Sequence, residues 1–199
     1  MLTYPFFAML FRMKYIHRWA LMRNTKAENL SEHAMETAAI THCLALIHNK
    51  RFGGQLNADR GAVIGLFHDC TEILTGDLPT PVKYHDAALR NSYKQMEKEA
   101  AGRMAAMLPP ELAEEYEGLL QPTPQDEYLW KLCKGADKLT ALIKCIEEEK
   151  MGNREFTSAK RATLKTLEGL QLPEVQVFME EYLPAFSLTL DELQAPEGE

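Results

Sequence analysis

Apolar residues recur at helical spacing through most of this chain of 199 residues, and no alternating run is long enough to predict a β-strand. The expected helices cover about residues 6–16, 32–50, 57–74, 86–108, 111–120 and 126–150, with two shorter helices on either side of Pro173. Glycines and prolines separate these segments. We therefore expect an all-α fold, a bundle of about seven or more helices in a single domain over residues 1–199, of which about 190–199 form an acidic frayed tail.

The net charge and the cysteines limit the class of partner and the compartment. A formal net charge of −7 argues against binding to a nucleic-acid polymer, which requires a basic face, and means that an anionic substrate needs local positive charge. No run of about 18 apolar residues occurs, so the sequence predicts no membrane span. The four cysteines form no CxxC pair and are typical of buried, reduced thiols, which favours a cytoplasmic protein.

One apolar run carries charged groups that a buried helix would not carry without a partner. The stretch GLFHDCTEILTGDLPTP, residues 65–81, places His68 beside Asp69, and Glu72 follows. If the helix continues through them, His68 and Glu72 lie about 40° apart around its axis with Asp69 beside them, so all three face one sector. A solvated polar stripe explains both carboxylates, but it explains His68 less well, since apolar residues surround it.

Two distant residues complete a possible group with these three. His33 lies in the first turn of a helix for which Asn29 or Ser31 can serve as N-cap, and Asp137 lies within an apolar helix. Taken singly, His33 is well explained as a capping or core histidine. Asp137 is equally well explained as a surface carboxylate that pairs with Lys134 at helical spacing.

Taken in order, the pattern H…HD…D resembles the signature of the HD-domain metal-dependent phosphohydrolase superfamily. The blocks RWALMRNTKAENLSEH, LFHDCTEILTGDLPTPVKY and KGADKLTALIKC are together similar to its bacterial 5′-deoxynucleotidases (deoxyribonucleoside 5′-monophosphatases), along nearly the full chain. The resemblance implies an all-α fold in which His33, His68, Asp69 and Asp137 bind one divalent metal ion. Such a mixed nitrogen and oxygen set suits cobalt, which the resemblance favours, as well as manganese, zinc, iron or nickel.

The resemblance also implies roles for residues around the metal. Glu72 would orient or deprotonate the attacking water, and the planar guanidinium of Arg18 would hold two phosphate oxygens, so both are candidate catalytic residues. Asp77 would accept a hydrogen bond from the 3′-hydroxyl and leave no room or partner for the 2′-hydroxyl of a ribose. The expected substrate-binding residues are Arg18, Trp19, His33, Asp77, Leu78, Pro79 and Thr80. From sequence alone, Trp19 is equally well explained as a partly buried anchor.

We therefore expect a phosphoric monoester hydrolase, a 5′-deoxynucleotidase of nucleotide metabolism. It would hydrolyse deoxyribonucleoside 5′-monophosphates to deoxyribonucleoside and phosphate, select against ribonucleotides and tolerate different bases. The resemblance also implies a homodimer, with an apolar helical surface near the termini as a candidate contact. Two alternatives stay open: an HD phosphohydrolase that acts on another nucleotide, and a non-catalytic module that binds nucleotide or a protein partner.

Overall fold

The computed structural model describes residues 3–83 and 85–194, except for the side chains of residues 80 and 81. Within these ranges the regular structure is helical, and the only β pairing is an isolated antiparallel bridge between His17 and Asn29. The predicted all-α fold is therefore confirmed. None of the helices in the same ranges combines the length and the apolar composition that crossing a membrane requires.

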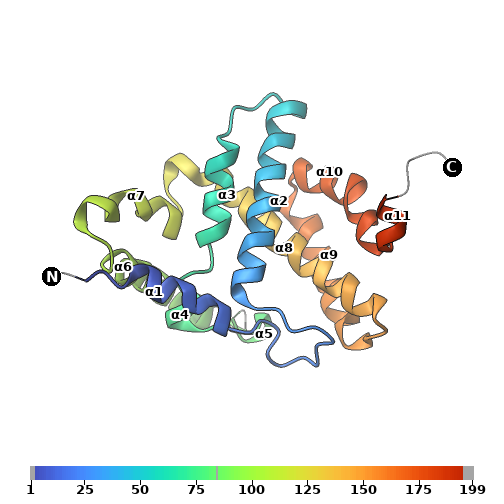
Figure 1. Cartoon of the computed structure of the whole chain (residues 1–199), viewed down its shortest axis with the longest axis horizontal. Coiled ribbons are helices and arrows are strands. Elements are labelled where there is room, and N and C mark those ends of the chain that lie inside the picture. The colour runs from blue at the N-terminus through green and yellow to red at the C-terminus, as the bar shows by residue number, and fades with distance from the viewer. Residues whose placement is uncertain (1–2, 84, 195–199) are drawn as a thin grey trace.

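Three helices form the centre of the molecule: α2 (Leu30–Arg51), α3 (Ala58–Phe67) and α8 (Glu127–Lys150). α2 and α3 pack side by side and run antiparallel, so α2 begins at the end of the pair where α3 finishes (Figure 1). α8 crosses both of them. α9 (Thr157–Leu170) packs along α8, and α10 (Pro173–Glu181) contacts α2 and α8.

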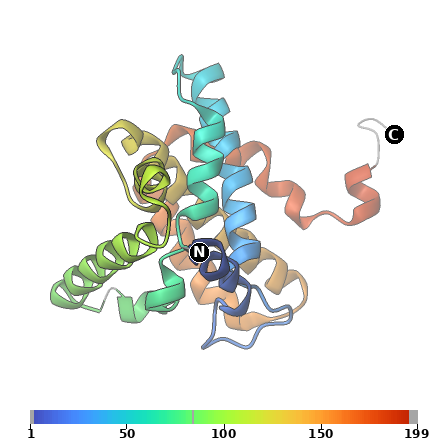
Figure 2. The same cartoon turned by 60° about the vertical axis from the view of Figure 1, so that its left-hand side comes forward.

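Shorter elements surround this centre. They are α1 (Phe6–Leu10), η1 (Phe11–Tyr15), α4 (Glu72–Thr75), α5 (Thr80–Lys83), α6 (Ala87–Ala105), α7 (Pro110–Leu120), η2 (Pro124–Asp126), η3 (Arg154–Phe156), η4 (Leu183–Ser187) and α11 (Leu190–Gln194), in which η denotes a 3-10 helix. Figure 2 shows α6 and the C-terminal elements extending from opposite sides of the central helices.

The start of α2 is determined by side-chain capping. The Asn29 side chain accepts hydrogen bonds from the backbone N–H groups of Ser31 and Glu32, and the Glu32 side chain accepts one from the Asn29 N–H, which completes a capping box. Of the two predicted N-caps, the structure therefore selects Asn29. A cap of this kind stabilises a helix by about 1 kcal/mol, and here it holds His33 in the first turn.

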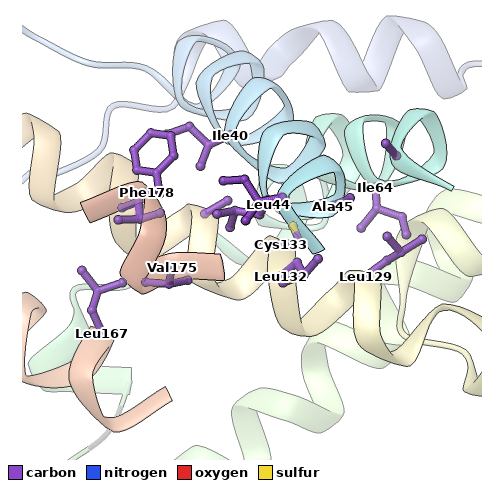
Figure 3. Close-up of a cluster of buried hydrophobic side chains, with 14 of the residues drawn as sticks. Ile40, Leu44, Ala45, Ile64, Leu129, Leu132, Cys133, Leu167, Val175 and Phe178 are labelled. Atoms are coloured by element: carbon purple, nitrogen blue, oxygen red, sulfur yellow. The ribbon is translucent and has the colours of Figure 1, made fainter. Parts of the chain in front are cut away.

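The main hydrophobic core lies where α2, α3, α8 and α10 meet (Figure 3). Ile40 and Leu44 of α2 pack there with Ile64 of α3, Leu132 of α8 and Phe178 of α10, all of them buried. A second, smaller cluster joins the N-terminal elements to the rest of the chain. It contains the buried residues Phe6, Met13, Leu30, Ala34, Cys70, Ala101, Met104, Leu108 and Leu120. All four cysteines are free thiols, and three of them are buried.

The segment that we expected to form one helix over residues 57–74 is interrupted. α3 ends before His68, a turn follows, and α4 begins at Glu72. In the turn the Gly65 carbonyl accepts a hydrogen bond from the His68 ring, and the Glu72 N–H bonds back three residues to the Asp69 carbonyl. The prediction that His68 and Glu72 share one face of a continuous helix was therefore wrong, because tighter turns replace the α-helical bonding there.

Three other boundaries differ from the sequence prediction. The expected first helix, 6–16, is divided between α1 and the 3-10 helix η1. The expected loop after α4 contains the short helix α5. Residues 190–194, expected to be frayed, form α11, whose side chains are all exposed, while 195–199 lie outside the described residues. η1 forms because the 3-10 hydrogen-bond pattern replaces the α-helical one after Leu10, whereas α5 and α11 form where the sequence shows little apolar periodicity.

Candidate active site and metal centre

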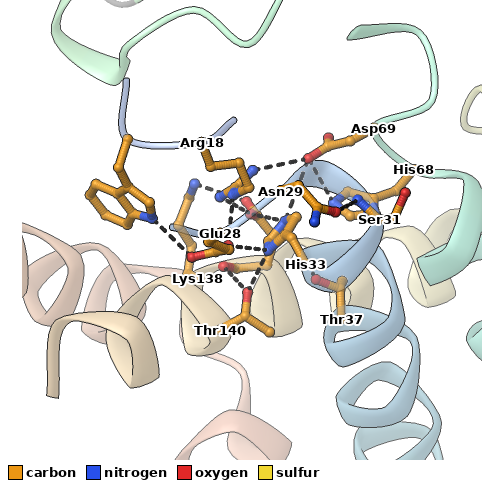
Figure 4. Close-up of polar contacts among 12 residues, drawn as sticks. Arg18, Glu28, Asn29, Ser31, His33, Thr37, His68, Asp69, Lys138 and Thr140 are labelled. Atoms are coloured by element: carbon orange, nitrogen blue, oxygen red, sulfur yellow. Dashed lines mark hydrogen bonds and ion pairs between the residues drawn. The ribbon is translucent and has the colours of Figure 1, made fainter. Parts of the chain in front are cut away.

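The four residues predicted to bind a metal come from three parts of the chain and meet at one place. His33 lies in the first turn of α2, His68 and Asp69 lie in the turn after α3, and Asp137 lies within α8. One ligand atom from each residue lies within 4.8 Å of the others, so the group could hold a metal ion. The antiparallel pairing of α2 and α3 explains the meeting of the two histidines, because one helix begins where the other ends. Figure 4 shows His33, His68 and Asp69 pointing toward one another.

Hydrogen bonds determine which ring nitrogen of each histidine carries the proton. His68 Nδ1 donates to the Gly65 carbonyl at 2.7 Å, and its Nε2 is buried with no hydrogen-bond partner among the described residues. The Thr140 hydroxyl donates to the Asp137 carbonyl, so its oxygen accepts from His33 Nδ1 at 3.2 Å. In the neutral form of each ring, Nε2 then carries the lone pair, which is the arrangement found in metal-ligating histidines.

The two carboxylates lie against these nitrogens. Asp69 Oδ2 lies 3.1 Å from His68 Nε2 and 3.5 Å from His33 Nε2, while Asp137 Oδ1 lies 3.2 Å from His33 Nε2. Burial alone would raise the pKa of both carboxyl groups. The His68 ring nevertheless holds the pKa of Asp69 well below its usual range, and Lys138 and His33 do the same for Asp137. Both groups are thus anionic at neutral pH, as metal ligands must be.

Glu72 is a buried carboxyl group with an unused oxygen. Its side chain is 5% exposed at the start of α4, and Oε2 has no hydrogen-bond partner within the described residues. Burial, together with the negative charges of Asp69 and Asp77, raises the pKa of Glu72 well above its usual value. A buried oxygen without a partner requires an explanation, and a water or ligand bound beside it would supply one.

Arg18 brings positive charge to the same group (Figure 4). Its Nη1 lies 3.4 Å from Asp69 Oδ2 and its Nη2 lies 3.8 Å from Asp137 Oδ1, with only 12% of the side chain exposed. Burial alone would lower the pKa of Arg18, but the carboxylates of Asp137, Asp69 and Glu28 raise it, so the guanidinium stays charged. An acidic protein thus presents local positive charge where an anionic substrate would need it.

Trp19 is held by a residue that the sequence reasoning did not single out. The Trp19 N–H (Nε1) donates to Glu28 Oε2 at 3.2 Å, and its ring packs against Phe156, with 5.2 Å between the ring centroids. Glu28 also lies 3.0 Å from Arg18, between its Oε1 and Nε atoms. The available signal was its position directly before the N-cap Asn29, in the first of the three blocks that carry the resemblance.

The predicted sugar-contacting segment links α4 to α5. Asp77, Leu78 and Pro79 are half-buried there, and Thr80 begins α5, although its side chain lies outside the described part of the structure. Burial raises the pKa of Asp77, and the positive charge of Arg18 opposes that shift. Asp77 therefore lies within electrostatic reach of the arginine.

Two cavities, of about 580 and 720 Å³, lie elsewhere in the described structure. They are lined by residues 23–26, the end of α8 and segments that follow it, and neither includes a residue of the group above. Neither lining contains a histidine. The convergence of ligand atoms and of buried groups without partners therefore locates the candidate active site better than cavity size does.

Comparison of the sequence with known proteins identifies close relatives. The profile of a family described as 5′-deoxynucleotidase YfbR-like matches residues 5–186. A 5′-deoxynucleotidase of Yersinia pestis (strain Pestoides F) is 47% identical over 188 residues, which cover 94% of this chain and 95% of that protein. A 5′-deoxynucleotidase of Yersinia pseudotuberculosis serotype O:3 (strain YPIII) matches to the same extent.

Solved structures share the fold at lower sequence identity. An HD-domain phosphohydrolase from Listeria innocua superposes with a TM-score of 0.78 at 23% identity, covering 92% of this chain and 88% of that one. A protein from Pyrococcus horikoshii OT3 gives a TM-score of 0.66 at 18% identity, covering 92% and 97%. These two matches support the fold, and the more similar sequences support the family. The chain belongs to the YfbR-like 5′-deoxynucleotidase family.

Proposed function

We propose that this protein is a phosphoric monoester hydrolase that converts a deoxyribonucleoside 5′-monophosphate and water to a deoxyribonucleoside and phosphate. The observation that carries the proposal is the convergence of His33, His68, Asp69 and Asp137, with one ligand atom from each within 4.8 Å of the others and the Nδ1 atom of both imidazoles in a hydrogen bond. Membership of a family whose curated members are named 5′-deoxynucleotidases supports the choice of substrate.

The four converging residues would hold one divalent transition-metal ion. Ligand atoms about 2.0–2.2 Å from a common centre lie up to about 4 Å apart, so only a small adjustment of the present spacing is needed. Cobalt is our first candidate, and the donor set also suits manganese, zinc, iron and nickel. When bound, such an ion neutralises phosphate oxygens and lowers the pKa of an adjacent water.

Glu72 would handle the proton of the attacking water. Its Oε2, which has no partner among the described residues, can hydrogen-bond to that water. The raised pKa keeps the Glu72 carboxyl group protonated while no cation is near, and the charge of a bound metal ion would lower this pKa so that the carboxylate can take a proton. A base that is inside the protein and poorly solvated can take the proton without first losing a hydration shell. General-base catalysis of this kind contributes about 10² to 10⁴ in rate.

Arg18 and Trp19 would hold the two ends of the phosphate ester. The contacts of Arg18 Nη1 and Nη2 with Asp69 and Asp137, at 3.4 and 3.8 Å, are longer than charge-assisted hydrogen bonds of about 2.7–2.9 Å. Both amino groups therefore keep donor capacity for two phosphate oxygens. The Trp19 ring, held against Phe156, would form a wall beside the nucleoside.

Asp77 to Thr80 would select the sugar. In this proposal the Asp77 carboxylate accepts a hydrogen bond from the 3′-hydroxyl, while Leu78 and Pro79 limit the space beside it. A ribose would then place its 2′-hydroxyl where it has no partner, at a cost of a few kcal/mol or about 10²-fold in kcat/KM. No comparable group is proposed to distinguish the bases, so purine and pyrimidine nucleotides should both be hydrolysed.

We also propose a cytoplasmic homodimer. On α1, η1 and the segment just before them, the aromatic side chains of Tyr4, Phe7, Phe11 and Tyr15 are 44%, 47%, 64% and 65% exposed, an arrangement that a contact between two copies would cover. Sedimentation equilibrium of the wild type and of Phe11→Glu would test this, with a dimer expected for the first and a monomer for the second. A wild-type monomer at micromolar concentration would contradict it.

The direct test of the function is phosphate release from matched substrates. Metal-free protein would be incubated with dAMP, AMP or dATP after addition of cobalt, manganese or zinc. We expect metal-dependent release from dAMP, with little from AMP or dATP. Release only from dATP would favour an HD phosphohydrolase of another specificity, and nucleotide binding without release would favour a non-catalytic module, so either result would refute the proposal.

Two variants on one helix separate the site from the fold. His33→Asn should lose bound metal and phosphate release together, because His33 supplies a ligand from the buried start of α2. His42→Asn is the matched control, since His42 is a partly exposed histidine farther along α2 with 38% of its side chain exposed. It should keep the metal content and the turnover of the wild type.

A further inference from the structure

Glu28 contacts both proposed substrate-binding side chains with one carboxylate. Its Oε1 lies 3.0 Å from Arg18 Nε, and its Oε2 accepts the hydrogen bond from Trp19 Nε1 at 3.2 Å. The contact with Arg18 is an ion pair, since Arg18 Nε has no aligned hydrogen bond within the described residues. The Glu28 side chain, labelled in Figure 4, is 12% exposed, and this low exposure shields both contacts from water.

The backbone holds Glu28 in register with Arg18. The Arg18 N–H donates to the Glu28 carbonyl at 3.0 Å, and the Leu30 N–H donates to the Ile16 carbonyl at 2.9 Å. These two bonds close the base of the loop between them and place Glu28 immediately before the N-cap of α2. The position of the Glu28 carboxylate is therefore linked to the same helix start that carries His33.

Trp19 adopts a backbone conformation that requires such support. Its φ of 57° lies in the left-handed region, which costs a bulky residue about 1–3 kcal/mol. Its carbonyl accepts hydrogen bonds from the Met22 N–H at 2.9 Å and from the Asn24 side chain at 3.3 Å, and its indole bonds to Glu28. A strained conformation held by several contacts at a candidate active site indicates that the direction of this ring matters.

We infer that Glu28 is a positioning residue that orients the Arg18 guanidinium and the Trp19 indole for the phosphate ester, without touching the substrate itself. Arg18 also lies near Asp69 and Asp137, but these carboxylates are proposed to bind the metal, and a carboxylate that ligates a cation has less charge left for an arginine. Glu28 pairs with Arg18 through Oε1, which also lies 3.6 Å from His33 Nδ1, the ring nitrogen that is not proposed to bind the metal. This inference rests on the proposed function.

Because each carboxylate oxygen of Glu28 makes one of the two contacts, replacement by Gln and replacement by Asp should have different effects. In Glu28→Gln one oxygen becomes an NH₂ group, which can accept from neither Arg18 nor Trp19, so one of the two contacts is lost. We expect kcat/KM for dAMP to fall about 10- to 100-fold, the loss expected for one contact with a charged group. Glu28→Asp keeps both acceptors on a shorter stem and should recover part of that loss. Glu114→Gln, at an exposed carboxylate on α7, is the control and should stay near the wild-type value.

A double-mutant cycle distinguishes positioning from a general structural effect. If Glu28 acts through Arg18 and Trp19, then Glu28→Gln should lower kcat/KM by less than about 3-fold once Arg18→Ala and Trp19→Phe are already present, because the guanidinium and the indole N–H that it contacts are gone. The inference is overturned if Glu28→Gln lowers kcat/KM by the same factor in the wild type and in the Arg18→Ala, Trp19→Phe protein. Bound metal per protein should be the same for the wild type and Glu28→Gln, and a parallel loss of metal would also overturn it.

Indole fluorescence provides a readout that does not depend on turnover. In a Trp130→Phe background Trp19 is the single tryptophan, and Glu28→Gln should shift its emission to longer wavelength as the ring leaves its buried hydrogen bond. Unchanged emission together with unchanged kcat/KM would refute the positioning role. If the wild type releases no phosphate from dAMP, the proposed function fails. A shift in emission would then still show that Glu28 orients Trp19, and an unchanged emission would show that it does not.

Discussion

Gly65→Ala tests whether the close approach of α2 and α3 is what brings the histidines together. A Cβ added at Gly65 would lie 2.5 Å from Ala38 Cα and 2.8 Å from Ala38 N. These are backbone atoms of α2, so no rotation of a side chain can relieve the overlap. His33 precedes Ala38 on α2 and His68 follows Gly65 directly after α3, so a separation of the helices at this contact also separates the two imidazoles.

The size of the effect follows from these distances. Carbon atoms in contact prefer about 3.5–4.0 Å, so the two helices must move apart by about 1 Å. Overpacking of this kind costs about 1–3 kcal/mol, and the preference of a helix for alanine over glycine returns about 1 kcal/mol. The expected net loss in the free energy of unfolding is therefore modest, up to about 2 kcal/mol. A displacement of about 1 Å between groups that act together can cost on the order of 10²-fold in turnover, so activity should fall more than stability.

The assay compares three glycines by urea unfolding, metal titration and kcat/KM for dAMP. Gly102 lies in α6 with nothing within 4 Å of an added Cβ, so Gly102→Ala should be neutral or stabilising by up to about 1 kcal/mol, with normal turnover. Gly61→Ala is intermediate, because its Cβ would meet only side-chain atoms, at 3.3 Å from Leu129 and 3.4 Å from Thr41. The reasoning is refuted if Gly65→Ala keeps wild-type metal affinity and turnover, or if Gly102→Ala loses them equally.

Other consequences of the structure can be checked in the same way. Although burial alone would raise the pKa of Glu148, Lys144 and the hydrogen bonds from Thr25 hold it at about 2, below the ordinary 4.5. The ionised Glu148 therefore stabilises the fold fully at pH values above its ordinary pKa of 4.5, and this stabilisation is lost as pH falls toward the folded-state pKa of about 2. In thermal melts, Glu148→Gln should have a lower Tm than the wild type at neutral pH, and the difference should shrink in acid. A chelator should lower the Tm of the metal-loaded wild type, and the free energy of unfolding should fall by about 2.7 kcal/mol if the free ion had been at 100 times its Kd. The same chelator should hardly change the Tm of Asp137→Asn, and equal shifts in the two proteins would contradict the metal site. Asp77→Asn should lower the ratio of dAMP to AMP turnover by at least about 10-fold, measured by phosphate release, and an unchanged ratio would remove Asp77 from sugar selection.

Much of the fold was predictable because its signals are local. Apolar spacing predicted α2, α6 and α8 to within a few residues, and the N-cap of α2 was among the two predicted positions. The break between α3 and α4 was not predictable in this way. Residues 65–74 keep an apolar composition across it, and the break depends on a hydrogen bond from the His68 ring to the Gly65 carbonyl that sequence spacing does not reveal.

The sequence by itself determined the helical class of the chain, the capped start of α2 and the residue types from which a metal site can be built. Only the tertiary structure decided that Arg18 lies against Asp69, 51 residues away, that the loop at Thr25 is anchored to Glu148, 123 residues away, and that Glu28 joins Arg18 to Trp19. The physical reason is range. Helix propensity and capping act over three or four residues, whereas these contacts depend on the path of the whole chain and on the exclusion of water from the place where its segments meet.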